Sequence, residues 1–208
     1  MPSFFDELYA RTMERVPSED VVIFVERNRP DLLKGPALDA GCGSGRHAIY
    51  MASRGITVHG LDESAVGIQR AQEWAAMDGR DIRFQQADIR RLPYSDAFFR
   101  GLVSWEAVFY GEAPTVKSGV AELFRVLGPG SPFLISFKST GDFRCEDFPK
   151  SAPNTHQTDQ GPMTFFDRSE LEGLLTPLSE GLNIEVLLRT LQNGAKRREN
   201  LIATGRKA

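Results

Sequence analysis

The chain has 208 residues, enough for one ordinary α/β domain and too few for two large ones. Hydrophobic residues make up 41% and charged residues 25%, close to the globular average, which excludes a largely disordered chain. The formal net charge of −3 argues against a surface that binds nucleic acid over its whole extent. Two cysteines, Cys42 and Cys145, are too few for a disulfide framework and indicate a reducing compartment.

The N-terminus shows no targeting signal. The first residues, MPSFFDELYARTMERV, carry Asp6 and Glu7 where a secretory signal needs a basic and then an apolar segment. Nowhere does an uninterrupted apolar stretch reach the ~18 residues that a membrane span needs. We therefore expect a soluble, cytoplasmic protein without a membrane partner.

Two helices are predicted before residue 35. Apolar residues recur at helical spacing through residues 3–15, and Ser18 caps a second helix that we expect to end at Pro30. From Gly35 onward, strand-like and helix-like segments alternate. This alternation predicts right-handed crossovers and a doubly wound, mostly parallel sheet. The predicted strands are 36–40, 56–61, 82–87, 98–104 and 132–137, and the helices are 45–53, 64–77 and 115–127.

The last third of the chain follows another pattern. Residues 139–163 are polar and rich in Pro, Gly, Ser and Thr without a period, which is typical of a functional cover or a disordered loop. Asp167 caps a short helix, and strands at 182–191 and 200–204 flank an Asn-Gly pair that favours a hairpin. The expected single domain therefore has four parts. They are a helical cover (1–34), a core (35–138), a lid segment (139–166) and a helix with a hairpin (167–208).

The segment LDAGCGSG at residues 38–45 places three glycines between a strand and a helix, directly after Asp39. Such a turn opens a crevice at the carboxyl end of a parallel sheet, where ligands bind. A dinucleotide-binding fingerprint needs a sixth-position glycine, and counting from Gly41 that position holds Arg46. A nicotinamide-dependent oxidoreductase is therefore the less favoured alternative.

The G-x-G-x-G arrangement resembles motif I of the class I S-adenosylmethionine-dependent methyltransferases. Three more segments are similar to the family in the same order: VHGLDES, FQQADIRRLPY and ELFRVLGPGSPFLIS. Together the matches span roughly residues 36–137, and the C-terminal hairpin resembles the family's reversed seventh strand. The resemblance implies a mostly parallel seven-stranded sheet with helices on both faces and a reversed strand near the C-terminus.

The resemblance also implies S-adenosylmethionine as cofactor. The glycine turn would approach its amino-acid tail with Asp39 toward the ammonium, Asp62 would accept from the ribose, and Asp88 with the Ile89 N–H would bind adenine. Glu63 departs from the family, which often has an apolar residue there. Taken singly, an aspartate at a strand end can be a helix cap, and Cys42 a packing residue. The predicted cofactor-binding residues are Tyr9, Asp39, Gly41, Cys42, Gly43, Gly45, Asp62, Glu63, Asp88, Ile89 and Trp105.

Methyl transfer is an in-line displacement, so alignment and water exclusion supply much of the catalysis. A neutral acceptor must also lose a proton, for which His156, Glu106 and Tyr110 are the candidate catalytic residues. No metal site is predicted. No large added domain is visible for RNA, DNA or a protein tail, which favours a small-molecule acceptor. A cofactor-binding regulatory module without methyl transfer is the other alternative.

Overall fold

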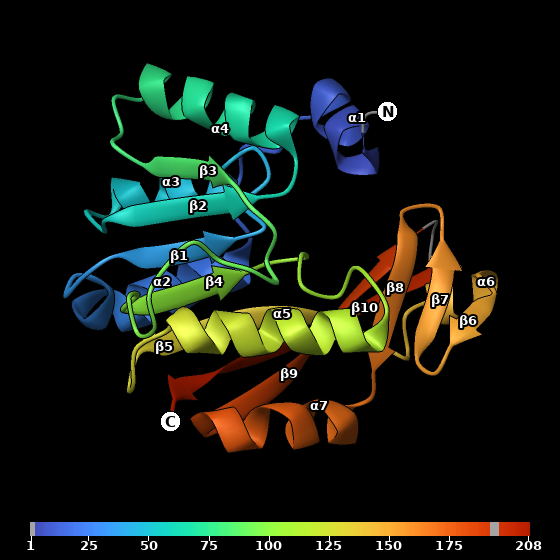
Figure 1. Ribbon diagram of the computed structural model, residues 1–208. Coiled ribbons are helices and arrows are strands. Elements are labelled where there is room, and N and C mark those ends of the chain that lie inside the picture. The colour runs from blue at the N-terminus through green and yellow to red at the C-terminus, as the bar shows by residue number, and fades with distance from the viewer. Residues whose placement is uncertain (1–2, 192–195) are drawn as a thin grey trace.

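The computed structural model describes residues 3–191 and 196–208 (Figure 1). Helix α1 (Phe4–Arg11) begins with a capping box between Ser3 and Asp6, and α2 (Glu19–Leu32) follows. The expected stop of α2 at Pro30 is wrong. The proline removes a single N–H near the helix end, and the next turn still closes because the Leu33 N–H donates to the Arg29 carbonyl.

Five parallel strands form the centre of the sheet in the order β3-β2-β1-β4-β5. This order confirms the doubly wound, mostly parallel arrangement expected from the alternating pattern. The strands are β1 (Ala37–Ala40), β2 (Val58–Asp62), β3 (Arg83–Gln86), β4 (Gly101–Ser104) and β5 (Pro132–Ser139). The intervening helices are α3 (Arg46–Ser53), α4 (Ala65–Met77) and α5 (Ala113–Val126).

The C-terminal part adds a reversed strand pair. Strand β10 runs antiparallel to β5 on one side and to β9 on the other, which confirms the predicted reversed strand. The Asn-Gly pair predicted to turn this hairpin lies outside the described residues. The elements are α7 (Arg168–Leu175), the 3-10 turn η1 (Thr176–Leu178), β9 (Ser179–Leu191) and β10 (Lys196–Lys207).

The polar segment after β5 is not a structureless loop. It contains a one-turn helix and an antiparallel three-stranded meander, whose last strand also pairs with the end of β5. Over residues 3–191 and 196–208 the sheet therefore has ten strands, where seven were expected. Strands this short and polar give no apolar period, and Asn154 and Gly161 supply the positive φ angles of their turns. The elements are α6 (Arg144–Asp147), β6 (Lys150–Ala152), β7 (Thr155–Thr158) and β8 (Gly161–Phe166).

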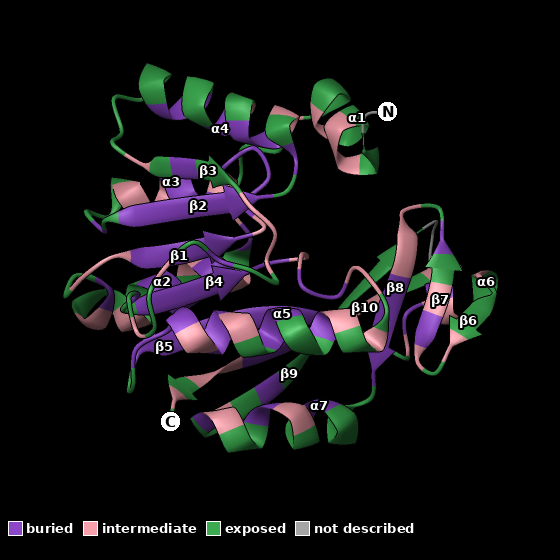
Figure 2. Ribbon diagram, in the orientation of Figure 1, coloured by how far each residue is buried: buried purple, intermediate pink, exposed green. Residues whose placement is uncertain are grey.

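Helices cover both faces of the sheet, and each face has its own apolar core. Helices α2, α3 and α4 pack on one face, whereas α5 and α7 pack on the other (Figure 1). Strands β1, β2, β4 and β5 are buried throughout, β3 at the edge buries only Phe84, and the helices turn polar residues outward (Figure 2). Within the described part of the chain, none of the helices has the length and apolar character of a membrane span.

Candidate active site

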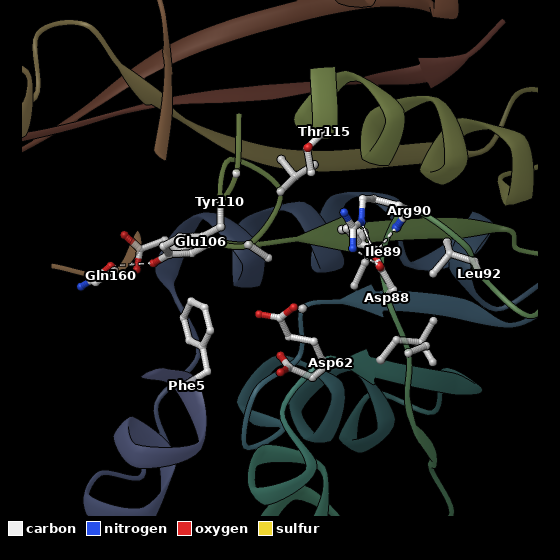
Figure 3. Close-up of a pocket in the computed structure, with 18 of the residues that line it drawn as sticks. Phe5, Asp62, Asp88, Ile89, Arg90, Leu92, Glu106, Tyr110, Thr115 and Gln160 are labelled. Atoms are coloured by element: carbon white, nitrogen blue, oxygen red, sulfur yellow. Dashed lines mark hydrogen bonds and ion pairs between the residues drawn. The ribbon is translucent and has the colours of Figure 1, made fainter. Parts of the chain in front are cut away.

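A cavity of about 320 Å³ lies at the carboxyl ends of β1, β2 and β4 (Figure 3). Its volume falls in the range of small-ligand sites. Its wall comes from segments far apart in the sequence: α1, the glycine turn, the ends of β2 and β3, the loop after β4, and the β7–β8 turn. The lining side chains that the site uses most are Tyr9, Asp62, Glu63, Asp88, Ile89, Glu106, Tyr110 and Gln160.

The glycine turn is crowded by the protein itself. Gly41 and Gly43 have φ angles of +75° and +52°, a region that glycine tolerates and other residues rarely adopt. A Cβ on Gly41 would lie 2.1 Å from the Ala107 Cβ, and one on Gly43 would lie 2.5 Å from the Tyr9 hydroxyl. The missing side chains therefore make room for the loop after β4 and for α1.

Asp62 stands at the end of β2 and faces the cavity (Figure 3). Its carboxylate accepts from the Gly43 N–H at 2.8 Å and from the Ser64 N–H at 2.9 Å, which ties the glycine turn to the next strand. Burial raises the pKa of Asp62 to about 6, although these two donors oppose the shift. The side chain is thus fixed in place with lone pairs left to accept from a ligand.

Asp39 is fully buried beneath the same turn. Neither carboxyl oxygen has a hydrogen-bond partner among the residues of 3–191 and 196–208. Burial raises the pKa of Asp39 to about 7, and the nearby Ala48 N–H opposes the shift only in part. Asp39 does not line the cavity, but an unsatisfied buried carboxylate beside it is a place for a positively charged group.

Asp88 and Ile89 follow β3 and line the end of the cavity that is opposite to Tyr110 and Gln160 (Figure 3). The Asp88 carboxylate is already engaged, because the Arg90 guanidinium donates to both of its oxygens. This hydrogen bonding, more than any other effect, lowers the pKa of Asp88. Glu63 also lines the cavity.

A smaller cavity of about 160 Å³ continues from the first along the glycine turn. Cys42, Gly43 and Trp105 line it, and Gly41, Tyr9 and Glu106 belong to both spaces. Gly45 lines neither. A Cβ there would lie 3.0 Å from the Ala71 Cβ, so this glycine allows the turn to pack against α4. Gly45 was expected to contact the cofactor, but in the structure it packs against α4 and lines neither cavity.

Glu106 lies where the cavities meet, and its backbone is unusual. Its φ of +52° is rare for a residue with a side chain and persists only where the surroundings impose it. Its N–H donates to the Ser136 hydroxyl at 2.6 Å, and its carboxylate accepts from Lys138 Nζ at 3.4 Å. Arg198 approaches the same carboxylate at 3.9 Å.

Lys138 is the buried partner of Glu106, with 2% of its surface exposed. Its ammonium donates to Asn200 Oδ1 at 2.6 Å and lies 5.1 Å from the centre of the Phe109 ring. Burial lowers the pKa of Lys138 to about 8 despite the Glu106 charge. Burial also opposes ionisation of Glu106, but the charges of Lys138 and Arg198 outweigh it, so the pKa of Glu106 lies below its ordinary value. The cavity thus faces an ionised carboxylate.

Tyr110 also faces the cavity, and its hydroxyl donates to Gln160 Oε1 at 2.9 Å (Figure 3). Burial raises the pKa of Tyr110, so the hydroxyl stays protonated at neutral pH. His156, predicted as a candidate catalytic residue, is not among the residues that line the cavity. Pairing of β7 with β8 turns its ring against Phe165, and its Nδ1 lies 2.9 Å from the Phe148 carbonyl oxygen.

Several lining residues were not expected from the sequence. Gln160 comes from the β7–β8 turn, Pro162 from β8, Thr115 from the start of α5, and Arg90 and Leu92 from the segment after β3. The last two stand within the FQQADIRRLPY match, so the motif offered a signal for them. The others reach the cavity through long-range packing, for which the sequence gives no pattern.

Comparisons with known proteins agree on one family. A family model described as a methyltransferase domain matches residues 37–130. A SAM-dependent methyltransferase from Methanosarcina mazei has a similar fold, with a TM-score of 0.65 at 22% identity, covering 86% of this chain and 95% of that one. The chain is therefore similar to methyltransferases over residues 37–130, and its fold is the Rossmann-like fold of the class I methyltransferases.

Other similar proteins have named activities. The 2-heptyl-1-hydroxyquinolin-4(1H)-one methyltransferase of Mycobacteroides abscessus is 30% identical over 121 residues, 57% of this chain and 52% of that protein. An O-methyltransferase of Aspergillus sclerotiorum is 28% identical over 155 residues, 73% of this chain and 52% of its own. The chain therefore spans about half the length of these relatives.

A structure with a bound ligand extends the comparison. Magnesium protoporphyrin IX methyltransferase of Synechocystis, solved with bound SAM, has a TM-score of 0.59 at 18% identity. The match covers 97% of this chain and 77% of that chain. For metals, the described residues contain no group of three or more His, Cys, Asp or Glu side chains that could hold an ion.

Proposed function

We propose that the protein transfers a methyl group from S-adenosylmethionine to a small-molecule acceptor. One observation carries the proposal: two buried carboxylates, Asp39 without a partner and Asp62 facing the cavity, lie on either side of the glycine turn. A molecule with an ammonium group and a ribose diol matches these two carboxylates. The family and its SAM-bound relative support the same ligand.

The side chains have distinct roles toward this cofactor. Asp62 accepts from the ribose hydroxyls, while Asp39 balances the ammonium group behind the turn. Asp88 exchanges its Arg90 contact for the adenine amino group, and Ile89 offers its backbone N–H. Tyr9 covers the amino-acid end, since its ring lies on Gly43. When bound, S-adenosylmethionine supplies an electrophilic methyl group on a sulfonium.

The acceptor would lie in front of Glu106 and Tyr110. Because Lys138 and Arg198 keep Glu106 ionised, its carboxylate accepts a hydrogen bond from the acceptor's proton-bearing atom and orients it. A carboxylate of low pKa is a weak base, so positioning is the larger part of its role. The phenol of Tyr110 remains a hydroxyl group and fixes the acceptor from the other side. The cavity volume of about 320 Å³ and the small-molecule substrate named for the Mycobacteroides relative favour a small acceptor.

Calorimetric titration with S-adenosylhomocysteine tests the proposal. We expect binding by the unaltered protein and a loss of affinity of about 10–100-fold in Asp62→Asn, because a charge-assisted hydrogen bond contributes roughly 1.5–3 kcal/mol. Asp81→Asn, an exposed change of the same kind, serves as the matched control. NADH should not bind.

Two other results would change the conclusion. Binding of NADH in place of S-adenosylhomocysteine would instead support a nicotinamide-dependent oxidoreductase. Binding of S-adenosylhomocysteine without transfer of labelled methyl groups to any phenol, amine or thiol tested would favour a regulatory module.

A further inference from the structure

Strand β9 forms the outer edge of the sheet beyond β10 (Figure 1). It has 13 residues, and within the described ranges its only partner is β10. Natural edge strands are usually short or are interrupted by lysine, proline or a bulge, which prevents pairing with another chain. From Asn183 to Leu191 β9 has no lysine or proline, and its pairing with β10 is regular. This edge is open to a further strand.

One face of the same strand has an exposed apolar row. Ile184 is buried against the α7 side of the sheet, but Val186 and Leu188, which follow at strand spacing on that face, are 53% and 49% exposed. The residue paired with Val186 on β10 is Leu201, which is buried. The apolar row therefore continues from the core to an uncovered edge.

The opposite face of β9 carries two charges placed symmetrically about Leu187. Glu185 lies two residues before Leu187 and Arg189 two residues after it. Arg189 stands directly opposite Arg198 in the hairpin, a like-charge pair that is unfavourable in a sheet. In the parts of the chain that the structure describes, neither Glu185 nor Arg189 forms an ion pair.

We propose that β9 pairs antiparallel with β9 of a second copy of this chain, about a two-fold axis at Leu187. Glu185 then faces the partner's Arg189, and Val186 faces the partner's Leu188, each contact occurring twice. The pairing places a carboxylate beside the two opposed arginines and covers the exposed apolar row. None of the residues that line the 320 Å³ cavity belongs to β9, although Leu187 and Arg189 line a neighbouring pocket together with Glu106.

The charges select one register. Moving the axis to Val186 sets Glu185 against the partner's Leu187 and Arg189 against the partner's Asn183. Moving it to Leu188 sets Arg189 against the partner's Leu187 and Glu185 against the partner's Leu191. Only the axis at Leu187 joins opposite charges on one face and apolar side chains on the other.

Sedimentation velocity tests the proposal. Because an interface of two paired strands is small, the dimer should be weak, and its fraction should be measured over a range of protein concentrations. We expect a dimer, and a dimer dissociation constant about tenfold or more weaker in Glu185→Arg and in Arg189→Glu, since each places two like-charge pairs across the interface. Glu73→Arg on exposed α4 is the matched control. Circular dichroism checks that each variant is folded.

Complementation makes the test specific. Glu185→Arg mixed with Arg189→Glu restores both opposite-charge pairs, so the mixture should form a one-to-one heterodimer, and a chain with both changes should form a homodimer again. A monomer at every concentration overturns the proposal. So does a dimer that is indifferent to the single changes, or a mixture that fails to associate.

Discussion

At the scale of single residues, two carboxyl groups next to the glycine turn are held at a cost to stability. Burial raises the pKa of Asp39 to about 7 and of Asp62 to about 6, so the folded chain binds these protons more tightly than the unfolded chain. The contribution of such a group to the free energy of unfolding falls as the pH rises from its ordinary value to its raised one. Binding sites commonly contain groups that lower the stability of the folded protein when no ligand is bound.

The substitution Asp39→Asn removes the buried charge and so measures how much that charge lowers the free energy of unfolding. At pH 8 the aspartate is charged and without a partner, so the variant should be more stable by roughly 1–3 kcal/mol. Near pH 4 the aspartate is largely neutral and the advantage should shrink toward zero. Urea unfolding at pH 4, 6 and 8 measures the difference. A variant whose stability relative to the unaltered protein does not change between pH 4 and pH 8 would contradict the assignment.

At the scale of elements, α1 lines one side of the cavity with Phe5 and Tyr9 and is weakly anchored. It has no buried residue, whereas α5 has six. It is attached by Asp6, which accepts from the Ser64 hydroxyl at 2.6 Å, by the Arg70 contact with the Ala10 carbonyl, and by Tyr9 on the glycine turn. A helix with so few buried contacts opens locally with little free energy.

Hydrogen exchange should show this opening. Without ligand, the amides of α1 should exchange faster than those of α5, because opening α1 exposes no core. S-adenosylhomocysteine at 100 times its Kd should slow exchange in α1 by up to about 100-fold, if opened α1 cannot hold the ligand. Helix α7, far from the cavity, is the internal control. Equal exchange in α1 with and without bound ligand would show that it is no cover.

The sequence predicted the elements that have a strong apolar period and missed those without one. Over 36–137, short apolar strands follow one another with amphipathic helices between most of them, so their order was readable. Strands β6, β7 and β8 are short and polar and are held by pairing with each other and with β5. Site residues at strand ends, such as Asp62, were predictable because parallel strands end at one edge. Gln160 reaches the cavity only through the meander.

The network behind Glu106 shows the same limit. Lys138 belongs to β5 and Asn200 to β10, and the two meet because β10 runs antiparallel beside β5. Their positions in the sequence are 62 residues apart. No local pattern signals that a lysine in an otherwise apolar strand is the partner of a carboxylate after β4. Only the sheet order makes that contact visible.

At the scale of the whole molecule, the cavity is built from segments between Phe5 and Pro162, so a ligand there joins most of the chain. Binding to the folded state alone raises the free energy of unfolding by about 2.7 kcal/mol at 100 times the Kd. For a domain of this size that corresponds to a rise in Tm of roughly 5–11 °C. Stabilisation by S-adenosylhomocysteine is therefore a readout of the site that needs no acceptor.

That stabilisation should depend on pH in a direction fixed by the two carboxyl groups. Both must be ionised to face an ammonium and a diol, so binding releases protons from Asp39 below about pH 7 and from Asp62 below about pH 6. Affinity should fall about tenfold per pH unit just below 7 and more steeply below 6, so the rise in Tm at fixed ligand should nearly vanish by pH 5.

In Asp39→Asn only Asp62 is left to take up a proton, so the fall in ligand affinity should begin nearer pH 6. Thermal shifts recorded at half-unit intervals from pH 5 to 8 measure both curves. A shift that is constant over this range would mean that neither carboxylate touches the ligand.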